Sequence, residues 1–303
     1  MINFTLRQLR YFDALARHGH FGRAAEACSI SQPALSVQIK ELEDTLGAEL
    51  FERAARQLRL SAFGEEFLLR VRDILRSVDE LGDLARAHRS QLVGRLRIGV
   101  IPTVAPYLLP ALISSLTSAN ADLDIHVRET VTPKLIQELA DGRLDTAIVA
   151  LPVSEPSMEE IPLFEESFVL VRPLEDEAKP VPSKDNLREM RLLLLEEGHC
   201  FREQALSFCD MGSVRPREIL DGSSLTTLVQ MVGAGIGVTL IPEIAMSVET
   251  RSAAVSIARF QEPQPSRTIG MIWRKTSPIA RQLTDVADVV RDAASQLRAT
   301  VAA

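Results

Sequence analysis

Apolar residues in the first sixty positions recur at helical spacing in three short stretches, at 6–18, 21–28 and 31–47. Ser31 is a good N-cap for the third stretch, and Pro33 is tolerated in a first turn, where backbone amides lack partners inside the helix. Only a short link separates the second and third stretches. The pattern therefore predicts three helices, of which the last two form a helix-turn-helix.

Two short apolar or basic segments, 51–53 and 58–60, follow the third helix and predict a small β-wing. The third helix carries polar side chains able to hydrogen-bond base edges or phosphates, and the arginines of a wing would grip the DNA backbone or minor groove. The alternative is a small helical packing module with a solvated polar face. The candidate DNA-binding residues are Ser31, Gln32, Pro33, Ser36, Gln38, Arg53 and Arg56.

A stretch without proline, 61–92, carries apolar residues in alternating steps of four and three. Such a seam has a period of 3.5 residues and is typical of a coiled coil. A long helix directly after a DNA-binding domain favours dimerisation, because two DNA half-sites require two heads. The alternative is a helix that packs on its own domain. The seam consists of Phe67, Val71, Ile74, Val78, Leu81 and Ala85.

Strand-like and helix-like segments alternate from residue 93 onward, which predicts an α/β domain with a largely parallel sheet. The rhythm repeats and so predicts two lobes. We place lobe I at about 93–166 and 269–303, and lobe II at about 167–268. The expected strands are 95–101, 123–129, 144–151, 167–173, 192–196, 217–221, 237–242 and 268–274, and the expected helices are 106–116, 132–142, 200–208, 224–233 and 278–298.

Four side chains with hydrogen-bonding or nucleophilic groups follow three of the expected strands. Thr103 comes after the first strand, Thr132 after the second, and His199 and Cys200 after the strand at 192–196. Ligands of open α/β sheets bind beyond the carboxyl ends of the strands, so these groups are candidates for one crevice. The alternatives are that Thr132 caps a helix and that Thr103 orders its turn.

Cys200 and Cys209 stand nine residues apart. On one continuous helix their axial separation is about 13 Å, whereas a disulfide requires α-carbons within about 7 Å. A bond between them would need the helix to unwind, which would make the disulfide a conformational switch. The spacing alone favours two buried structural cysteines and leaves the switch as the alternative.

Composition places these segments in a chain of two or more domains, because 303 residues exceed one ordinary core. No apolar run is long enough to span a membrane and the start lacks a signal peptide, so we expect a cytoplasmic protein without a structural disulfide. The net charge of −7 does not suggest nucleic acid, but residues 53–64 hold three arginines and no acid. Five scattered histidines predict no metal or cofactor. We interpret Cys28 as a small core residue.

The segment AAEACSISQPALSVQIKELEDTLGAELFER, residues 24–53, closely resembles the winged helix-turn-helix of LysR-type transcriptional regulators. The resemblance implies binding to double-stranded promoter DNA, with Gln32, Pro33 and Ser36 at the major groove and Arg53 and Arg56 on the wing. It also implies dimerisation through the linker helix, assembly as a homotetramer, and a two-lobed regulatory domain similar to periplasmic solute-binding proteins. The expected domains are 1–60, 61–92 and 93–303.

Three further segments, IPTVAPYLLPALI at 101–113, LEEGHCFREQALSFC at 195–209 and RTIGMIW at 267–273, resemble the OxyR-type hydrogen peroxide sensors within this family. The resemblance implies that Cys200 is oxidised by peroxide and that Cys209 resolves the product to a reversible disulfide. It assigns peroxide binding to Thr103, Thr132 and His199. It further implies contacts with RNA polymerase and resetting by cellular thiol reductants.

Two positions depart from relatives, since Val229 stands where an arginine occurs in some of them and Pro133 where a histidine can occur. Two other functions stay open at this point. One is a LysR-type regulator controlled by a small organic anion, with structural cysteines. The other is a cysteine enzyme fused to a DNA-binding head, but no Cys-His-Asn or Cys-His-Asp arrangement has recognisable spacing, so we expect no enzyme.

Overall fold

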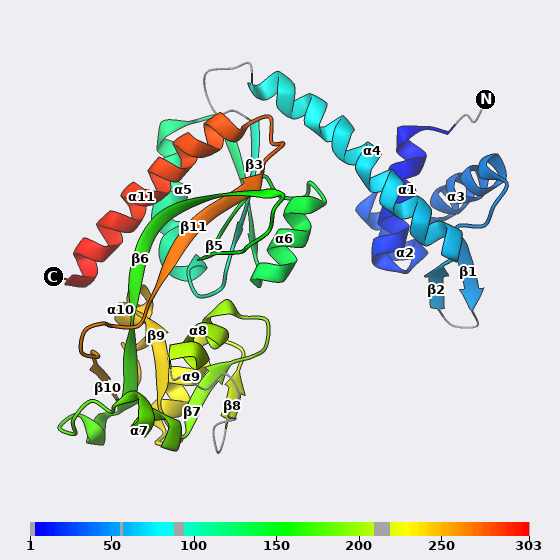
Figure 1. Cartoon of the computed structure of the whole chain (residues 1–303). Helices are drawn as coiled ribbons and strands as arrows, with labels where there is room; N and C mark the ends of the chain where they lie inside the picture. Colours follow the sequence, from blue (N-terminus) through cyan, green and yellow to red (C-terminus); the bar gives the residue numbers. More distant parts are fainter. Residues whose placement is uncertain (1–3, 55–56, 88–93, 209–218, 303) are drawn as a thin grey trace. The chain divides into compact units, whose positions relative to one another are not determined.

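The computed structural model describes residues 4–54, 57–87, 94–208 and 219–302 (Figure 1). The chain separates into two compact units, residues 1–85 and 86–303. The division falls inside the helix that the sequence predicts as a linker. Each unit has a hydrophobic core of its own.

Unit 1 begins with three helices, α1 (Leu6–His18), α2 (Phe21–Ala27) and α3 (Gln32–Leu46). The Ser31 side chain accepts a hydrogen bond from a backbone amide in the first turn of α3, and Gly47 ends this helix in the left-handed conformation. The predicted helix-turn-helix is therefore confirmed. Leu9, Phe12, Leu15, Leu35 and Leu42 are fully or almost fully buried between the helices.

The wing is an antiparallel pair of strands, β1 (Phe51–Ala54) and β2 (Gln57–Leu60), which confirms its prediction. Helix α4 (Ala62–Ala87) follows directly. Val71, in the first half of the helix, is fully buried in the core of unit 1, whereas Leu81 is 66% exposed. The apolar seam is thus divided, since its beginning packs on its own domain and Leu81 in its later part is exposed among the described residues.

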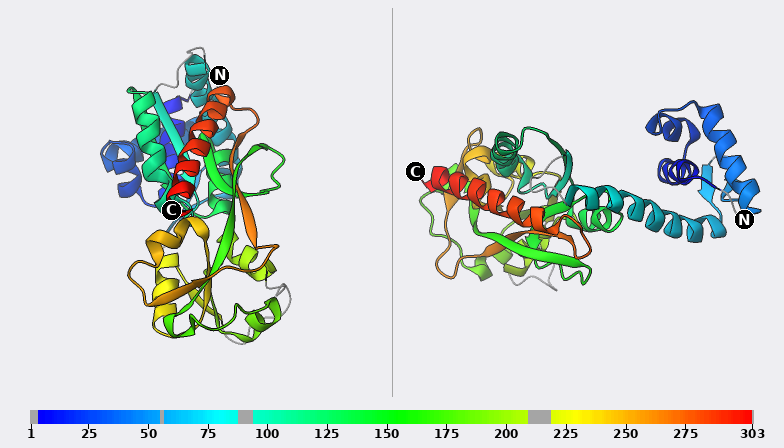
Figure 2. Two further views of the ribbon diagram at one scale, coloured as in Figure 1. Left: turned by 90° about the vertical axis from the view of Figure 1, so that its left-hand side faces the viewer. Right: turned by 90° about the horizontal axis from the view of Figure 1, so that it is seen from above.

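Lobe I of unit 2 is built on one sheet with the strand order β4-β3-β5-β11-β6. β3 runs parallel to β4 and β5, whereas β11 is antiparallel to β5 and β6. Helices α5 and α11 pack against each other beside this sheet, and both views in Figure 2 show them side by side. The elements are β3 (Gly94–Val100), α5 (Ala105–Ala119), β4 (Leu123–Glu129), α6 (Thr132–Ala140), β5 (Thr146–Leu151), β6 (Met158–Pro173), β11 (Ser266–Arg274) and α11 (Ala280–Ala302).

Lobe II is formed around the second half of β6, which pairs antiparallel with β9 and β10. A parallel pair, β7 and β8, joins it through a bridge between Leu192 and Val238. The elements are α7 (Lys184–Glu189), β7 (Leu192–Leu195), α8 (Cys200–Phe208), β8 (Ile219–Gly222), α9 (Leu225–Gly233), β9 (Thr239–Pro242), α10 (Met246–Glu249) and β10 (Val255–Ala258), with short 3-10 turns at Leu174–Asp176 and Glu243–Ala245.

The expectation of a largely parallel sheet is only partly correct, because the two long strands that connect the lobes, β6 and β11, are antiparallel to each other. The predicted start of β6 at residue 167 is wrong, since the strand begins at Met158. Its first half carries several glutamates, whose polarity hid a strand with one solvated face. The short strand β10 and helix α7 were also not predicted.

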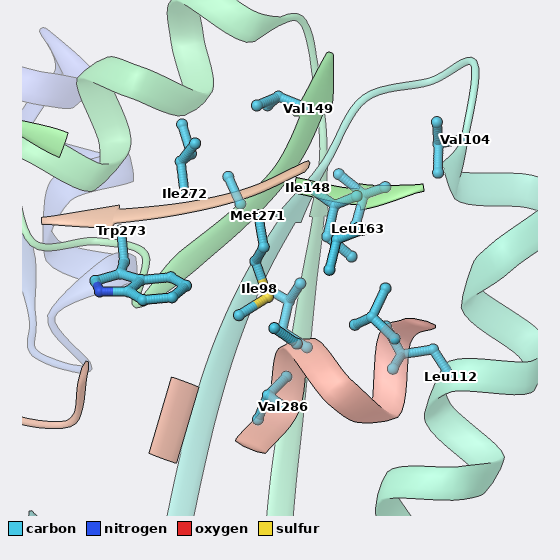
Figure 3. Close-up of a cluster of buried hydrophobic side chains, with 14 of the residues drawn as sticks. Ile98, Val104, Leu112, Ile148, Val149, Leu163, Met271, Ile272, Trp273 and Val286 are labelled. Atoms are coloured by element: carbon cyan, nitrogen blue, oxygen red, sulfur yellow. The ribbon is translucent and has the colours of Figure 1, made fainter. Parts of the chain in front are cut away.

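Each lobe has a hydrophobic core of its own. The core of lobe I lies between its sheet and helices α5, α6 and α11, and Trp273 is buried in it with Ile98 and Met271 (Figure 3). The core of lobe II includes one residue from lobe I, Tyr107 of α5. Its hydroxyl donates a hydrogen bond of 2.6 Å to Oε1 of Glu249. Burial is the main cause that raises the pKa of the Tyr107 phenol, and this hydrogen bond adds to the rise. The phenol therefore keeps its proton and donates it to Glu249 in the hydrogen bond.

Gly64, in the first turn of α4, has no room for a side chain, because a Cβ there would lie 2.1 Å from the carbonyl oxygen of Leu50. We expect Gly64→Ala to lower the free energy of unfolding by about 1–3 kcal/mol, the usual cost of overpacking. Gly82 in the same helix is the matched control, since nothing lies within 4 Å of its added Cβ.

Gly82→Ala is expected to raise the stability by up to about 1 kcal/mol, because alanine has the higher helix propensity. Urea unfolding followed by far-ultraviolet circular dichroism measures both variants. If both substitutions changed the free energy of unfolding in the same direction, the close contact between Gly64 of α4 and Leu50 would be contradicted.

Candidate functional site

The turn between β3 and α5 presents Thr103, which is only 3% exposed. Its hydroxyl oxygen accepts a hydrogen bond of 2.9 Å from Nη1 of Arg267, and its carbonyl oxygen accepts one of 3.4 Å from Nη2. Since the Thr103 oxygen already accepts from a cation, the hydrogen of the same hydroxyl is free to donate to another group.

Arg267, at the start of β11, is a buried cation with a buried partner. Its guanidinium lies 2.6 Å from Oε1 of Glu166, and the two side chains are 1% and 3% exposed. The two residues face each other across the β11–β6 ladder. Burial raises the pKa of the Glu166 carboxyl and the guanidinium opposes this rise, so the charge of Glu166 depends on Arg267.

Two aromatic rings complete the surroundings of Arg267. Its guanidinium carbon lies 6.0 Å from the ring centroid of Phe168 and 5.3 Å from that of Phe201, within cation–π range. The rings meet edge to face with centroids 4.9 Å apart. Because Phe201 directly follows Cys200, this network connects Thr103 in lobe I with the start of α8 in lobe II.

Cys200 is the first residue of α8 and carries a free, half-buried thiol. It packs against the edge of the lobe I core. Gly198, two residues before it, adopts φ +94°, and a Cβ there would lie 3.8 Å from the side chain of Val131. The beginnings of α8 and α6 are therefore close together.

Thr132 is the first residue of α6, and the N-cap is Val131, without a side-chain hydrogen bond. The alternative that Thr132 caps this helix is therefore wrong. Its Oγ1 is buried and has no hydrogen-bond partner within the part of the chain that the structure describes. A buried hydroxyl without a partner is costly, so it is suited to a small polar ligand.

His199 is half-buried directly before Cys200. Burial lowers the pKa of its imidazole, and the carboxylate of Glu196 opposes this shift. The ring is therefore predominantly neutral at neutral pH, with one nitrogen that donates and one that accepts.

Thr103 follows β3, Thr132 follows β4, and His199 and Cys200 follow β7, and the contacts of Phe201 with Arg267 and of Gly198 with Val131 bring these segments near one another. The sequence pattern does not single out Arg267, Glu166 or Phe201. Arg267 stands at the start of a largely apolar strand, whereas Glu166 is one of four glutamates in β6 and is not distinguished by composition.

Helix α8 ends at Phe208, and Cys209 lies outside the described residues. Its predicted separation from Cys200 stays a prediction. Cys28, by contrast, is the C-cap residue of α2 and is half-buried. Burial raises the pKa of its thiol, which favours the unreactive protonated form. The interpretation of Cys28 as a core residue is only partly correct, because Cys28 is not among the core residues described for unit 1.

The described DNA-binding candidates lie at the N-cap of α3, along its first half, and on β1. Gln32, Pro33 and Lys40 are exposed, and Ser36 is half-buried. Ser31 caps the helix through its side chain. Gln38 donates a hydrogen bond of 2.7 Å to Glu41, so part of its capacity is used within the helix. Arg53 lies on β1, whereas Arg56 falls outside the described residues.

No group of three or more histidine, cysteine, aspartate or glutamate side chains is placed to hold a metal ion among residues 4–54, 57–87, 94–208 and 219–302. Within the same ranges, no helix is long and apolar enough to cross a membrane.

Two family models match the chain. "Bacterial regulatory helix-turn-helix protein, lysR family" matches residues 6–65, and "LysR substrate binding domain" matches residues 89–295. The chain is 43% identical over 298 residues to the "Probable hydrogen peroxide-inducible genes activator" of Streptomyces viridosporus, which covers 97% of this chain and 95% of the relative. It is 39% identical to the "DNA-binding transcriptional dual regulator OxyR" of Escherichia coli K12, with 95% of each chain covered.

Solved structures agree with these relatives. Full-length OxyR of Pseudomonas aeruginosa with a cysteine-to-aspartate substitution is 37% identical, covers 95% of each chain and superposes with a TM-score of 0.74. A cysteine-to-serine mutant of Corynebacterium glutamicum OxyR with hydrogen peroxide bound is 35% identical, covers 98% of this chain and 95% of that chain, and has a TM-score of 0.69. The chain belongs to the LysR family of bacterial regulators and, within it, to the OxyR group.

Proposed function

We propose that this chain is a DNA-binding transcriptional regulator of the oxidative stress response that senses hydrogen peroxide through Cys200. The observation that carries the proposal is the position of the free Cys200 thiol, beside the network of Thr103, Arg267 and Glu166. Relatives named for hydrogen peroxide, one with peroxide bound, support the same oxidant.

The chemistry follows from the groups around the thiol. The Cys200 thiolate attacks one peroxide oxygen, the O–O bond breaks, and the sulfur becomes a sulfenic acid while hydroxide leaves. Thr103 donates the hydrogen that its contact with Arg267 leaves free, and the buried Thr132 hydroxyl supplies a second hydrogen bond. Neutral His199 gives a donor for the leaving hydroxide, which takes up a proton to form water.

The second step is condensation of this sulfenic acid with the Cys209 thiol, which forms a disulfide and releases water. Helix α8 occupies the whole interval from Cys200 to Phe208, so the disulfide requires it to unwind. Phe201 and Ala205 of this helix are buried in the core of lobe II. Oxidation would therefore withdraw Phe201 from Arg267 and remodel the interface of the two lobes, and cellular thiol reductants would reverse it.

In this proposal, unit 1 binds the DNA. The start of α3 would read the major groove of promoter DNA and the wing would contact the backbone. Ile74, Leu81 and Leu84 on α4 are 41%, 66% and 52% exposed and are suited to a homodimer seam. A homotetramer would then couple remodelling of the regulatory domains to the spacing of the DNA-binding heads and to contacts with RNA polymerase. The chain would act in the cytoplasm as a regulator and not as an enzyme.

Oxidation of the reduced chain with one equivalent of hydrogen peroxide tests the sensor directly. We expect a loss of about 2 Da and a cross-linked peptide that contains Cys200 and Cys209. Cys200→Ser should abolish this change, whereas Cys209→Ser should stop at a sulfenic acid that a dimedone reagent traps. Cys28→Ser is the control and should behave as the unchanged chain. Thiols that stay free under excess peroxide would refute the proposal.

Arg267→Met is expected to slow the reaction of Cys200 with hydrogen peroxide by about tenfold or more, because a charge-assisted hydrogen bond of about 1.5–3 kcal/mol no longer orients Thr103. Arg259→Met removes a surface ion pair with Glu243 and is the control, expected to react at the unchanged rate. Quenched-flow alkylation with mass detection gives both rates, and circular dichroism verifies folding. Equal rates in the two variants would exclude this role for Arg267.

Ser36→Ala and Gln32→Ala are expected to weaken binding to a cognate promoter fragment by about 1–3 kcal/mol each, the usual cost of a lost base contact. Thr45→Ala is the matched control, because its exposed hydroxyl bonds the carbonyl of Glu41 at the far end of the same helix. Fluorescence anisotropy at fixed salt measures all three. A loss in Thr45→Ala as large as in the others would argue against the start of α3 as the reading surface.

A further inference from the structure

A cleft opens directly beside Cys200. It has a volume of about 480 Å3 and is enclosed by the end of β5, by one face of α8 and by the start of β11. A water molecule occupies roughly 30 Å3 in the liquid, so hydrogen peroxide needs only a small part of this volume. The size lies within the range of about 300–1,000 Å3 that is typical of sites for organic ligands.

The cleft is lined by both apolar and polar groups. Leu151, Pro152 and Phe208 provide apolar surface, whereas Ser207 and Ser266 provide hydroxyls. Such a lining suits a ligand with a compact apolar group and one polar end.

The charged lining of the cleft disfavours organic anions. Glu203 is its single charged lining residue among those that the structure describes, and no lysine, arginine or histidine lines it. Gln204 lines the cleft as well, and its buried Oε1 has no hydrogen-bond partner within the described chain. The cleft therefore offers a carboxylate and an unsatisfied acceptor, which favour a neutral ligand that donates a hydrogen bond.

We propose that this cleft binds the organic group of an alkyl hydroperoxide and delivers its terminal oxygen to Cys200, so that the chain also senses organic hydroperoxides. The inference rests on the proposed function, because it uses the same thiol. The hydroperoxide O–H donates to Gln204 Oε1, and the alkyl or aryl group lies against Leu151, Pro152 and Phe208.

The reaction differs from that of hydrogen peroxide only in the leaving group. The Cys200 thiolate attacks the terminal oxygen, an S–O bond forms and the O–O bond breaks. The sulfur is oxidised by two electrons to the sulfenic acid, and the alkoxide takes a proton to leave as the alcohol. The Cys209 thiol then displaces water and forms the same disulfide.

The test compares cumene hydroperoxide with hydrogen peroxide on the reduced full-length chain, by quenched-flow alkylation and intact mass. We expect cumene hydroperoxide to oxidise Cys200 at a rate within tenfold of that of hydrogen peroxide. Ser207→Phe fills the cleft from the exposed side of α8 and should lower the rate with cumene hydroperoxide at least tenfold. The rate with hydrogen peroxide should stay within twofold, because Ser207 is not part of the peroxide site.

Ser118→Phe is the matched control, since it places the same ring on an exposed position of α5 away from the cleft. It should leave both rates unchanged. In the unsubstituted chain, cumyl alcohol should compete with cumene hydroperoxide and not with hydrogen peroxide, which tests the cleft even where Ser207→Phe fails to fold.

The outcomes are separable. Oxidation by hydrogen peroxide without oxidation by cumene hydroperoxide overturns the inference and leaves the proposed function intact. Equal slowing of both oxidants by Ser207→Phe, or no competition by cumyl alcohol, also overturns it. If the Cys200 thiol reacts with neither oxidant, the proposed function itself is refuted.

Discussion

The arrangement of unit 2 depends on a buried positive charge. Arg267 lies where the two long strands β6 and β11 pass from one lobe to the other, and its side chain is 1% exposed. An unpaired charge in such a position costs several kcal/mol. The cost is offset only where Glu166, the Thr103 oxygens and the rings of Phe168 and Phe201 keep their places. One cation therefore fixes the register of the strands and the position of the helix that carries Cys200.

The same constraint would allow the proposed reaction at Cys200 to affect the whole regulatory unit. Phe201 belongs to α8 and Thr103 to the opposite lobe, yet both rest on the same guanidinium. A change in α8 therefore alters the solvation of Arg267, and the energy of a desolvated charge changes steeply with its surroundings. The Tyr107–Glu249 hydrogen bond links the lobes at a second point.

Local chemistry in the sequence was enough to predict unit 1, because its helices end at Gly19 and Gly47 and α3 begins at Ser31, signals that act within one turn. The strand ends that carry Thr103 and Cys200 were predictable for the same reason. The pairing of Arg267 with Glu166 was not, since 101 residues separate them and only the fold brings them together. The early start of β6 was missed because a strand with one solvated face resembles a polar loop in composition.

The chain contains a single tryptophan, and its place in the fold has an optical consequence. Trp273 lies in the lobe I core, six residues after Arg267 on the same strand, or about 20 Å along β11. Because the Trp273 ring is buried in this core, a shift in intrinsic fluorescence on oxidation would report a rearrangement that reaches the lobe I core, without any label.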